Sequence, residues 1–154
     1  MSQHSIELVD SADLPDLLGL MRAYSDFYEV APSDGALLDL SRALIAGPDV
    51  EGVQLIARDE RSQAVGFATI FWSWDTTEAG RIGIMNDLYV DPGARGSGLA
   101  DRLIEASVER CAQRDAVRLE WMTGPENLRA QKVYDRVGGV REPWLIYTRA
   151  VPAR

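Results

Sequence analysis

The pattern of apolar and polar positions divides the chain into alternating strands and helices. The apolar run at 6–9 is typical of a short strand, and apolar residues at steps of three and four predict a helix from Pro15 to about Glu29. Residues 32–35 interrupt this spacing and start a second helix, which ends near Gly47. The chain is therefore expected to begin with one strand and two helices.

Three strand-like runs follow in the middle of the chain. Residues 53–57 and 64–72 are joined by a polar segment, which predicts an antiparallel hairpin, and 82–90 adds a third strand. After a glycine-rich turn, apolar residues at helical spacing predict a helix from Leu99 to about Cys111. The remaining expected elements are a strand at 117–122, a helix at 127–137 and a closing strand at 144–147. This order predicts a mixed α/β fold.

Composition narrows the class of protein. The chain has 154 residues, of which 46% are apolar and 26% charged, so one globular domain covering residues 1–154 is expected. The longest nearly apolar run, 65–72, is much shorter than the roughly 20 residues that cross a bilayer. Residues 1–10 show no signal-peptide pattern. A cytoplasmic location with no membrane attachment is therefore expected.

Charge argues against a nucleic-acid-binding protein, and the few cysteines and histidines argue against a zinc-binding or disulfide-linked one. The 24 acidic and 16 basic residues give a net charge of -8, which disfavours nucleic acid as a partner. Cys111 is the only cysteine and His4 the only histidine, so neither an intramolecular disulfide nor a structural zinc site is expected. We expect no metal, and we interpret Cys111 as a core residue.

The turn between the third expected strand and the next helix is the most informative part of the chain. It has the sequence Arg95-Gly96-Ser97-Gly98-Leu99-Ala100. Glycines at such positions let a ligand approach the backbone, and the start of a helix leaves N–H groups free for an anion such as pyrophosphate. A Walker loop would need a lysine at a position where the sequence has none, and a dinucleotide fingerprint would need glycine or alanine in place of Asp101. An anion site of another kind is predicted, with a plain strand-to-helix turn as the alternative.

The same turn resembles the R-x-x-G-x-[GA] signature of the GNAT superfamily of N-acetyltransferases, whose members bind acetyl-coenzyme A (acetyl-CoA) through it. Residues 127–139 resemble a second superfamily segment, N-x-x-A-x-x-[FLV]-Y-x-x-x-G, at the expected distance. Residues 86–90 and 121–127 look most like the diamine and polyamine branch and its fungal histone or D-amino-acid relatives. The resemblance implies a mixed, mostly antiparallel central sheet with helices on both faces. It also implies an enzyme that transfers an acetyl group from acetyl-CoA directly to an amine.

The resemblance assigns roles to individual residues. Tyr134 is implied as the acid that protonates or hydrogen-bonds the departing sulfur, and Asn127 as a hydrogen-bond partner of the pantetheine arm. These two residues are seven positions apart, so both project from one face of the same helix. The other implied cofactor-binding residues lie in the strand backbone and in the turn, namely Leu88, Tyr89, Val90, Arg95, Gly96, Ser97, Gly98, Leu99 and Ala100.

Several groups compete to remove the proton of the attacking amine. Glu120, Asp87 and Glu29 are each expected near the acceptor, and an ordered water relay is the remaining alternative. We assign Glu120 as the catalytic residue beside Tyr134. Trp72 and Trp74 share one strand face, which suits either the wall of an acceptor pocket or ordinary sheet packing.

The acceptor is expected to be a small-molecule amine of the amino-acid, diamine or polyamine class. The negative charge of the chain favours cationic amines. Asn86 stands where the diamine enzymes tend to carry a glutamate, which favours amino acids or short amines over long polyamines. The alternatives are a protein or peptide N-acetyltransferase and a non-catalytic acyl-CoA-binding domain. Many relatives resemble homodimers built through their C-terminal strands, so a homodimer is also considered.

Overall fold

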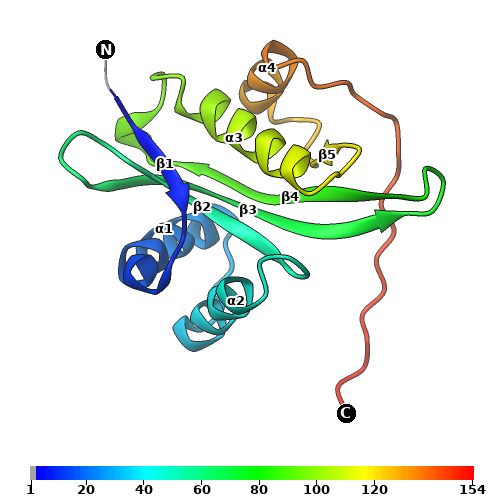
Figure 1. The fold of residues 1–154 in the computed structure, drawn as a ribbon, viewed down its shortest axis with the longest axis horizontal. Helices are drawn as coiled ribbons and strands as arrows, with labels where there is room; N and C mark the ends of the chain where they lie inside the picture. The colour runs from blue at the N-terminus through cyan, green and yellow to red at the C-terminus, as the bar shows by residue number, and fades with distance from the viewer. Residues whose placement is uncertain (1–2) are drawn as a thin grey trace.

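The computed structural model describes residues 3–154, in which a five-stranded sheet lies between two layers of helices (Figure 1). One face is covered by α1 (Leu14–Phe27) and α2 (Asp34–Ala46), and the other by α3 (Leu99–Gln113) and α4 (Leu128–Arg136). The strands are β1 (Ser5–Leu8), β2 (Gly52–Arg58), β3 (Ala64–Asp75), β4 (Gly80–Val90) and β5 (Leu119–Glu120). This arrangement confirms the expected mixed, mostly antiparallel sheet with helices on both faces.

Local sequence explains where the first helices begin. The short 3-10 helix η1 (Ser11–Asp13) begins with a capping box. The Asp10 side chain accepts from the backbone of Asp13, and the Asp13 side chain accepts from the backbone of Asp10. Pro15 follows in the first turn of α1, where its missing N–H costs nothing. The hydroxyl of Ser33 accepts from the amide of Ala36 at 3.1 Å and caps α2.

The strands pair in chain order, but the last pairing is very short. β1 to β4 are successively antiparallel, whereas β5 runs parallel to β4 and pairs only Gly83 with Leu119 and Ile84 with Glu120. A Cβ on Gly83 would lie 2.5 Å from the Cys111 sulfur, so glycine lets α3 lie close to the sheet. Cys111 is buried as predicted.

A bulge interrupts β4 beyond the end of β5. Thr69 of β3 lies opposite Asp87, and the next residue, Ile70, lies opposite Met85, so Asn86 is the extra residue. A bulge bends its strand and increases the local twist. The second half of β4 is therefore free to diverge from β5.

Side chains alternate along the strands and build one core on each face of the sheet. Leu55 and Ile70 contribute to the core under α3, whereas Ile56, Phe67 and Tyr89 contribute to the core under α1. Within residues 3–154, no helix has the length and apolar character needed to cross a membrane.

The C-terminal part of the chain differs from the sequence expectation. The expected strand at 117–122 is reduced to β5, and the closing strand predicted at 144–147 is wrong, because these residues have no regular structure. Residues 140–154 extend away from the body as a single chain (Figure 1, orange to red). Trp144 and Tyr147 are 81% and 90% exposed. A strand needs a neighbour for its backbone groups, and this segment lies beside none of the five strands.

Candidate active site

The turn between β4 and α3 presents backbone N–H groups that have no protein acceptor. Gly96 and Gly98 both have φ of +80°, the left-handed conformation that glycine adopts without a side-chain penalty. In the described part of the chain, the amides of residues 96–100 donate no hydrogen bond, and the Arg102 amide is bonded to the Gly98 carbonyl. Free amides at the positive end of α3 form a site suited to a pyrophosphate.

Side chains of the turn fix its shape. Nε of Arg95 donates to the Val90 carbonyl at 3.0 Å, and the Ser97 hydroxyl donates to the Ala94 carbonyl at 2.6 Å. Leu99 is 1% exposed and belongs to the core under α3, so only its backbone can contact a ligand. The turn is thus anchored to the end of β4 and to the core while its amides stay open.

Within residues 3–154, the edge of β4 next to this turn has no neighbouring strand. β5 covers only Gly83 and Ile84, so residues 85–90 are paired with β3 alone. Alternate backbone N–H and C=O groups on such an edge are available to the amides of an extended ligand. Leu88, Tyr89 and Val90 occupy this edge, as the predicted role of their backbone requires, although the Tyr89 side chain is buried against α1.

Asn127 caps the start of α4, and Tyr134 lies within that helix. Oδ1 of Asn127 accepts from the Ala130 amide at 3.2 Å and caps the helix, which leaves its Nδ2 group as a free donor. The Tyr134 ring packs edge-on against Trp121, with centroids 5.4 Å apart. Burial, and to a smaller extent the nearby Tyr28 phenol, raises the pKa of Tyr134. The Tyr134 phenol therefore stays protonated at neutral pH and can donate a proton.

The glycines after α4 and one ion pair hold the helix in place. Gly138 has φ of +83°, and the amides of Gly138 and Gly139 bond back to the carbonyls of Asp135 and Tyr134, which ends the helix in a Schellman motif. Arg136 makes two hydrogen bonds to Asp101 in the first turn of α3, at 2.8 and 2.6 Å. This pair joins the helix that carries Tyr134 to the helix that begins at the glycine turn.

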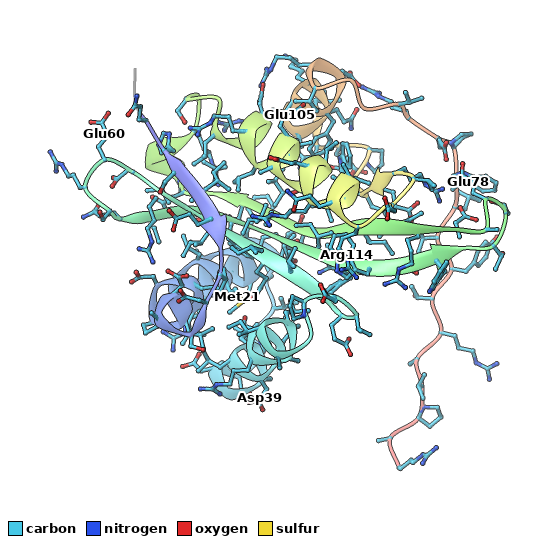
Figure 2. The ribbon with its side chains drawn as sticks, in the orientation of Figure 1. Met21, Asp39, Glu60, Glu78, Glu105 and Arg114 are labelled. Atoms are coloured by element: carbon cyan, nitrogen blue, oxygen red, sulfur yellow. The ribbon has the colours of Figure 1, made fainter. Side chains whose placement is uncertain are left out.

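Glu120 has a different environment from the one expected of a base. Its carboxylate accepts from Arg118 at 3.0 and 3.1 Å, and Arg118 also binds Asp75 and Glu78. Glu78 lies at the tip of the β3–β4 hairpin, at the end of the sheet opposite the start of α3 (Figure 2). The structure therefore places Glu120 in a surface ion cluster. Glu29 is exposed beyond the end of α1.

Asp87 is the acidic residue next to the bulge of β4. It is half-buried, and its Oδ1 accepts from the Asn86 side chain at 3.0 Å. The hydroxyl of Tyr24 from α1 donates to the Asn86 carbonyl at 3.3 Å and lies beside the Asp87 carboxylate. Burial raises the pKa of Asp87, although the neighbouring polar groups of Thr69, Tyr24 and Asn86 oppose the shift.

The two tryptophans do not wall a pocket together. Trp72 is buried, and its Nε1 donates to the Pro48 carbonyl at 2.8 Å. Trp74 is exposed beneath the Arg81 guanidinium, 4.8 Å from its ring centre. Both contacts match the sheet-packing alternative.

The arrangement of an amide-rich turn, an open strand edge and a nearby tyrosine agrees with one known family. The sequence model described as the Acetyltransferase (GNAT) family matches residues 17–139. The chain belongs to this family. As a GNAT acetyltransferase it is an N-acetyltransferase enzyme, which confirms the reaction class expected from the sequence.

Individual relatives support the family assignment over most of the chain. The GNAT protein is 30% identical over 152 residues to the uncharacterized N-acetyltransferase YhfO of Bacillus subtilis, which covers 97% of this chain and 99% of that protein. It is 32% identical over 123 residues to a D-amino-acid N-acetyltransferase of Saccharomyces cerevisiae, 77% of this chain and 73% of the yeast protein. A solved aminoglycoside N-acetyltransferase in complex with CoA has the same fold, with a TM-score of 0.84 over 97% of this chain and 96% of that one at 22% identity.

The sequence alone does not show that three residues gather near the bulge of β4. Tyr24 fits the apolar spacing of the first helix, whereas its hydroxyl lies at the bulge of β4. Gln54 and Thr69 were hidden inside apolar strand runs, and both are buried and hydrogen-bonded to each other. Two polar residues inside otherwise apolar strands were the available signal, because buried polar side chains need partners.

Proposed function

We propose that this enzyme transfers the acetyl group of acetyl-CoA to the amine of a small cationic molecule, an amino acid or a short amine. The observation that carries the proposal is the row of free amides at residues 96–100, which follows directly on the open edge of β4. A pyrophosphate at those amides would direct the rest of an extended cofactor along that edge. Tyr134 would then meet the thioester.

Each step of direct aminolysis has a candidate group in this arrangement. The thioester carbonyl would receive hydrogen bonds from the backbone of residues 88–90, where charge develops on its oxygen. The amine nitrogen attacks the carbonyl carbon, a C–N bond forms and the C–S bond breaks. The sulfur leaves as a thiolate and takes a proton from Tyr134, while Asn127 binds the pantetheine arm.

The proposed class of acceptor rests on the side chains at the bulge of β4. Tyr24 and Asp87 offer one aromatic ring and one carboxylate there, in a chain whose net charge is -8. A carboxylate beside an aromatic ring suits an ammonium group. The yeast relative with a D-amino-acid acceptor supports amino acids, and the absence of a second carboxylate at Asn86 disfavours long polyamines.

The test is the release of CoA from acetyl-CoA across a panel of amines. We expect kcat/KM to be highest for free amino acids or short amines, compared with putrescine, spermidine and short basic peptides. A peptide preferred by more than about 100-fold, or about 2.7 kcal/mol of transition-state binding, would assign a peptide acceptor instead. Binding of acetyl-CoA without turnover on any amine would indicate the non-catalytic acyl-CoA-binding domain.

We also propose that the enzyme acts as a homodimer that covers the C-terminal segment, residues 140–151. Val140, Leu145 and Ile146 are between 64% and 87% exposed, and the neighbouring aromatic residues are equally open. Such a run of apolar side chains is costly to leave in water. β5 is one of the two edge strands, and it offers backbone groups for the segment of a second copy.

Light scattering tests the dimer. The full chain is expected to have twice the mass of the monomer, and a chain ending at Gly139 is expected to be monomeric with unchanged helical circular dichroism. A monomeric full chain at the concentration of the activity assay would refute this proposal. The cytoplasmic location stays a prediction from the sequence.

A further inference from the structure

A chain of buried polar side chains crosses the sheet beneath α1 and ends at Asp87. Gln54 of β2 is 4% exposed and Thr69 of β3 is fully buried. Nε2 of Gln54 donates to Oγ1 of Thr69 at 3.1 Å, and it also lies 3.6 Å from the Met21 sulfur. Because the Thr69 oxygen accepts from Gln54, its own hydroxyl hydrogen is free to donate elsewhere.

Asp87 is the residue that lies opposite Thr69 on the next strand. Thr69 and Asp87 are directly opposite in the β3–β4 register, so their side chains lie on the same face of the sheet. The Asn86 side chain donates to the carboxylate at 3.0 Å, and the neighbouring Thr69 and Tyr24 hydroxyls, like Asn86, act to lower its pKa. The carboxylate therefore has neutral polar neighbours from β3, α1 and β4.

Asp87 differs from the other enclosed carboxylates in having no cation. Asp13, Asp75 and Asp101 each form an ion pair with an arginine, whereas Asp87 forms none within residues 3–154. A half-buried carboxylate without a counter-charge is costly, and an ammonium group that enters the site would relieve that cost. Neutral donors can orient the carboxylate without neutralising it.

We propose that Asp87, and not Glu120, receives the ammonium group of the acceptor and takes its proton, and that Thr69 and Gln54 are positioning residues for that carboxylate. This inference rests on the proposed function. An N–H bond of the ammonium breaks and its proton moves to a carboxylate oxygen of Asp87. The nitrogen lone pair then attacks the thioester carbon, and the nitrogen loses its second proton to solvent as the thiolate leaves.

The pH profile of kcat/KM distinguishes this role from a structural one. The group must be ionised to accept a proton, so activity is expected to fall as the pH drops through the raised pKa of Asp87. Tyr24 is the titratable residue that faces it, and burial first, then the Asp87 charge, raises the pKa of Tyr24, so that phenol stays neutral. In Asp87→Asn only free amine reacts, and kcat/KM should rise about tenfold per pH unit up to the pKa of the amine.

Asp87→Asn is expected to lower kcat/KM at neutral pH by about 100-fold with unchanged affinity for acetyl-CoA. The matched control is Asp39→Asn, at a carboxylate on α2 far from β4 (Figure 2), and it should keep full activity. Circular dichroism and acetyl-CoA affinity show whether each variant is folded. A loss in Glu120→Gln with an unaffected Asp87→Asn would overturn the proposal and return the base to β5.

Substitutions of Thr69 give a second test, in which the pH profile shifts and the activity is not lost. Thr69→Val keeps the shape but removes the hydroxyl, so the pKa of Asp87 should rise and the acid limb should move to higher pH, while Thr69→Ser should restore it. Gln54→Leu is expected to act in the same direction with a smaller shift. An unmoved acid limb in a folded Thr69→Val enzyme would refute the positioning role. If the wild-type enzyme binds acetyl-CoA but acetylates no amine, the proposed function fails instead.

Discussion

α3 and α4 lie on the same face of the sheet, yet they pack against it very differently (Figure 1). α3 buries side chains along its whole length, from Leu99 to Cys111. No residue of α4 is fully buried, and Tyr134 is only half-buried. The glycine turn is therefore joined to the core through α3, whereas Tyr134 is carried by a helix on the surface.

The difference has a physical consequence for α4. A helix of nine residues is too short to be stable alone, since isolated helices need about 12–15 residues even in favourable sequences. Its order depends on the Asn127 cap, the glycine ending, the Trp121–Tyr134 contact and the Arg136–Asp101 pair. Substitutions in α3 should thus affect stability first, and substitutions in α4 should affect catalysis first.

The largest expected effect is on folding. Leu103 of α3 is fully buried between the helix and the sheet, so Leu103→Ala removes apolar contacts and leaves a cavity. We expect the free energy of unfolding to fall by about 2–5 kcal/mol, measured by urea denaturation.

The matched variant is Leu128→Ala at the first position of α4, where the leucine is 64% exposed. Its free energy of unfolding should stay within about 0.5 kcal/mol of wild type. Equal losses in the two variants would show that α4 is packed as firmly as α3, and the contrast between the two helices would be wrong.

The next effect is on turnover. Tyr134→Phe keeps the ring against Trp121 and removes the hydroxyl, so kcat at saturating substrates is expected to fall by about 100-fold. The dissociation constant of acetyl-CoA and the unfolding midpoint should stay at their wild-type values. A rate within about threefold of wild type would mean that the thiolate leaves without an acid from this residue.

The sequence predicted most of the fold and the position of the glycine-rich turn because both depend on local patterns. Period-two and helical spacing located β2, β3 and α3, and the glycine spacing at 96 and 98 located the turn with free amides. The prediction of a closing strand at 144–147 failed because pairing needs a partner strand, which sequence spacing does not contain.

The acceptor side was harder to predict because it depends on register. A one-residue bulge at Asn86 decides that Asp87 lies opposite Thr69, and no local pattern marks the bulge. Glu120 looks equally suitable as a base in the sequence. In the structure it pairs with Arg118, which also binds Asp75 and Glu78 of the β3–β4 hairpin. The difference between Asp87 and Glu120 thus comes from contacts between distant segments, which local sequence patterns do not contain.

A smaller effect is expected at the turn itself. Gly98→Val would disfavour the φ of +80° by roughly 1–2 kcal/mol, so the amides would leave the binding geometry and the dissociation constant of acetyl-CoA should rise about tenfold. Gly93→Ala is the control, because that residue does not have a positive φ and its Cβ would make only an ordinary contact with Asp91. Calorimetry of both variants decides the matter; equal affinities would mean that the turn does not bind the pyrophosphate.

The smallest effect concerns the ion pair between α4 and α3. Arg136→Gln removes both hydrogen bonds to Asp101, and because both side chains are partly in water we expect KM for acetyl-CoA to rise by no more than about fivefold. Wild type should approach the variant as salt is added. The Arg136 guanidinium lowers the pKa of Asp101, so the pair is complete above the ordinary carboxyl range and is lost only as the pH falls through that lowered value. The ratio of the two KM values should therefore be the same at pH 6 and pH 8, and a ratio that changes between them would assign the effect to another titrating group.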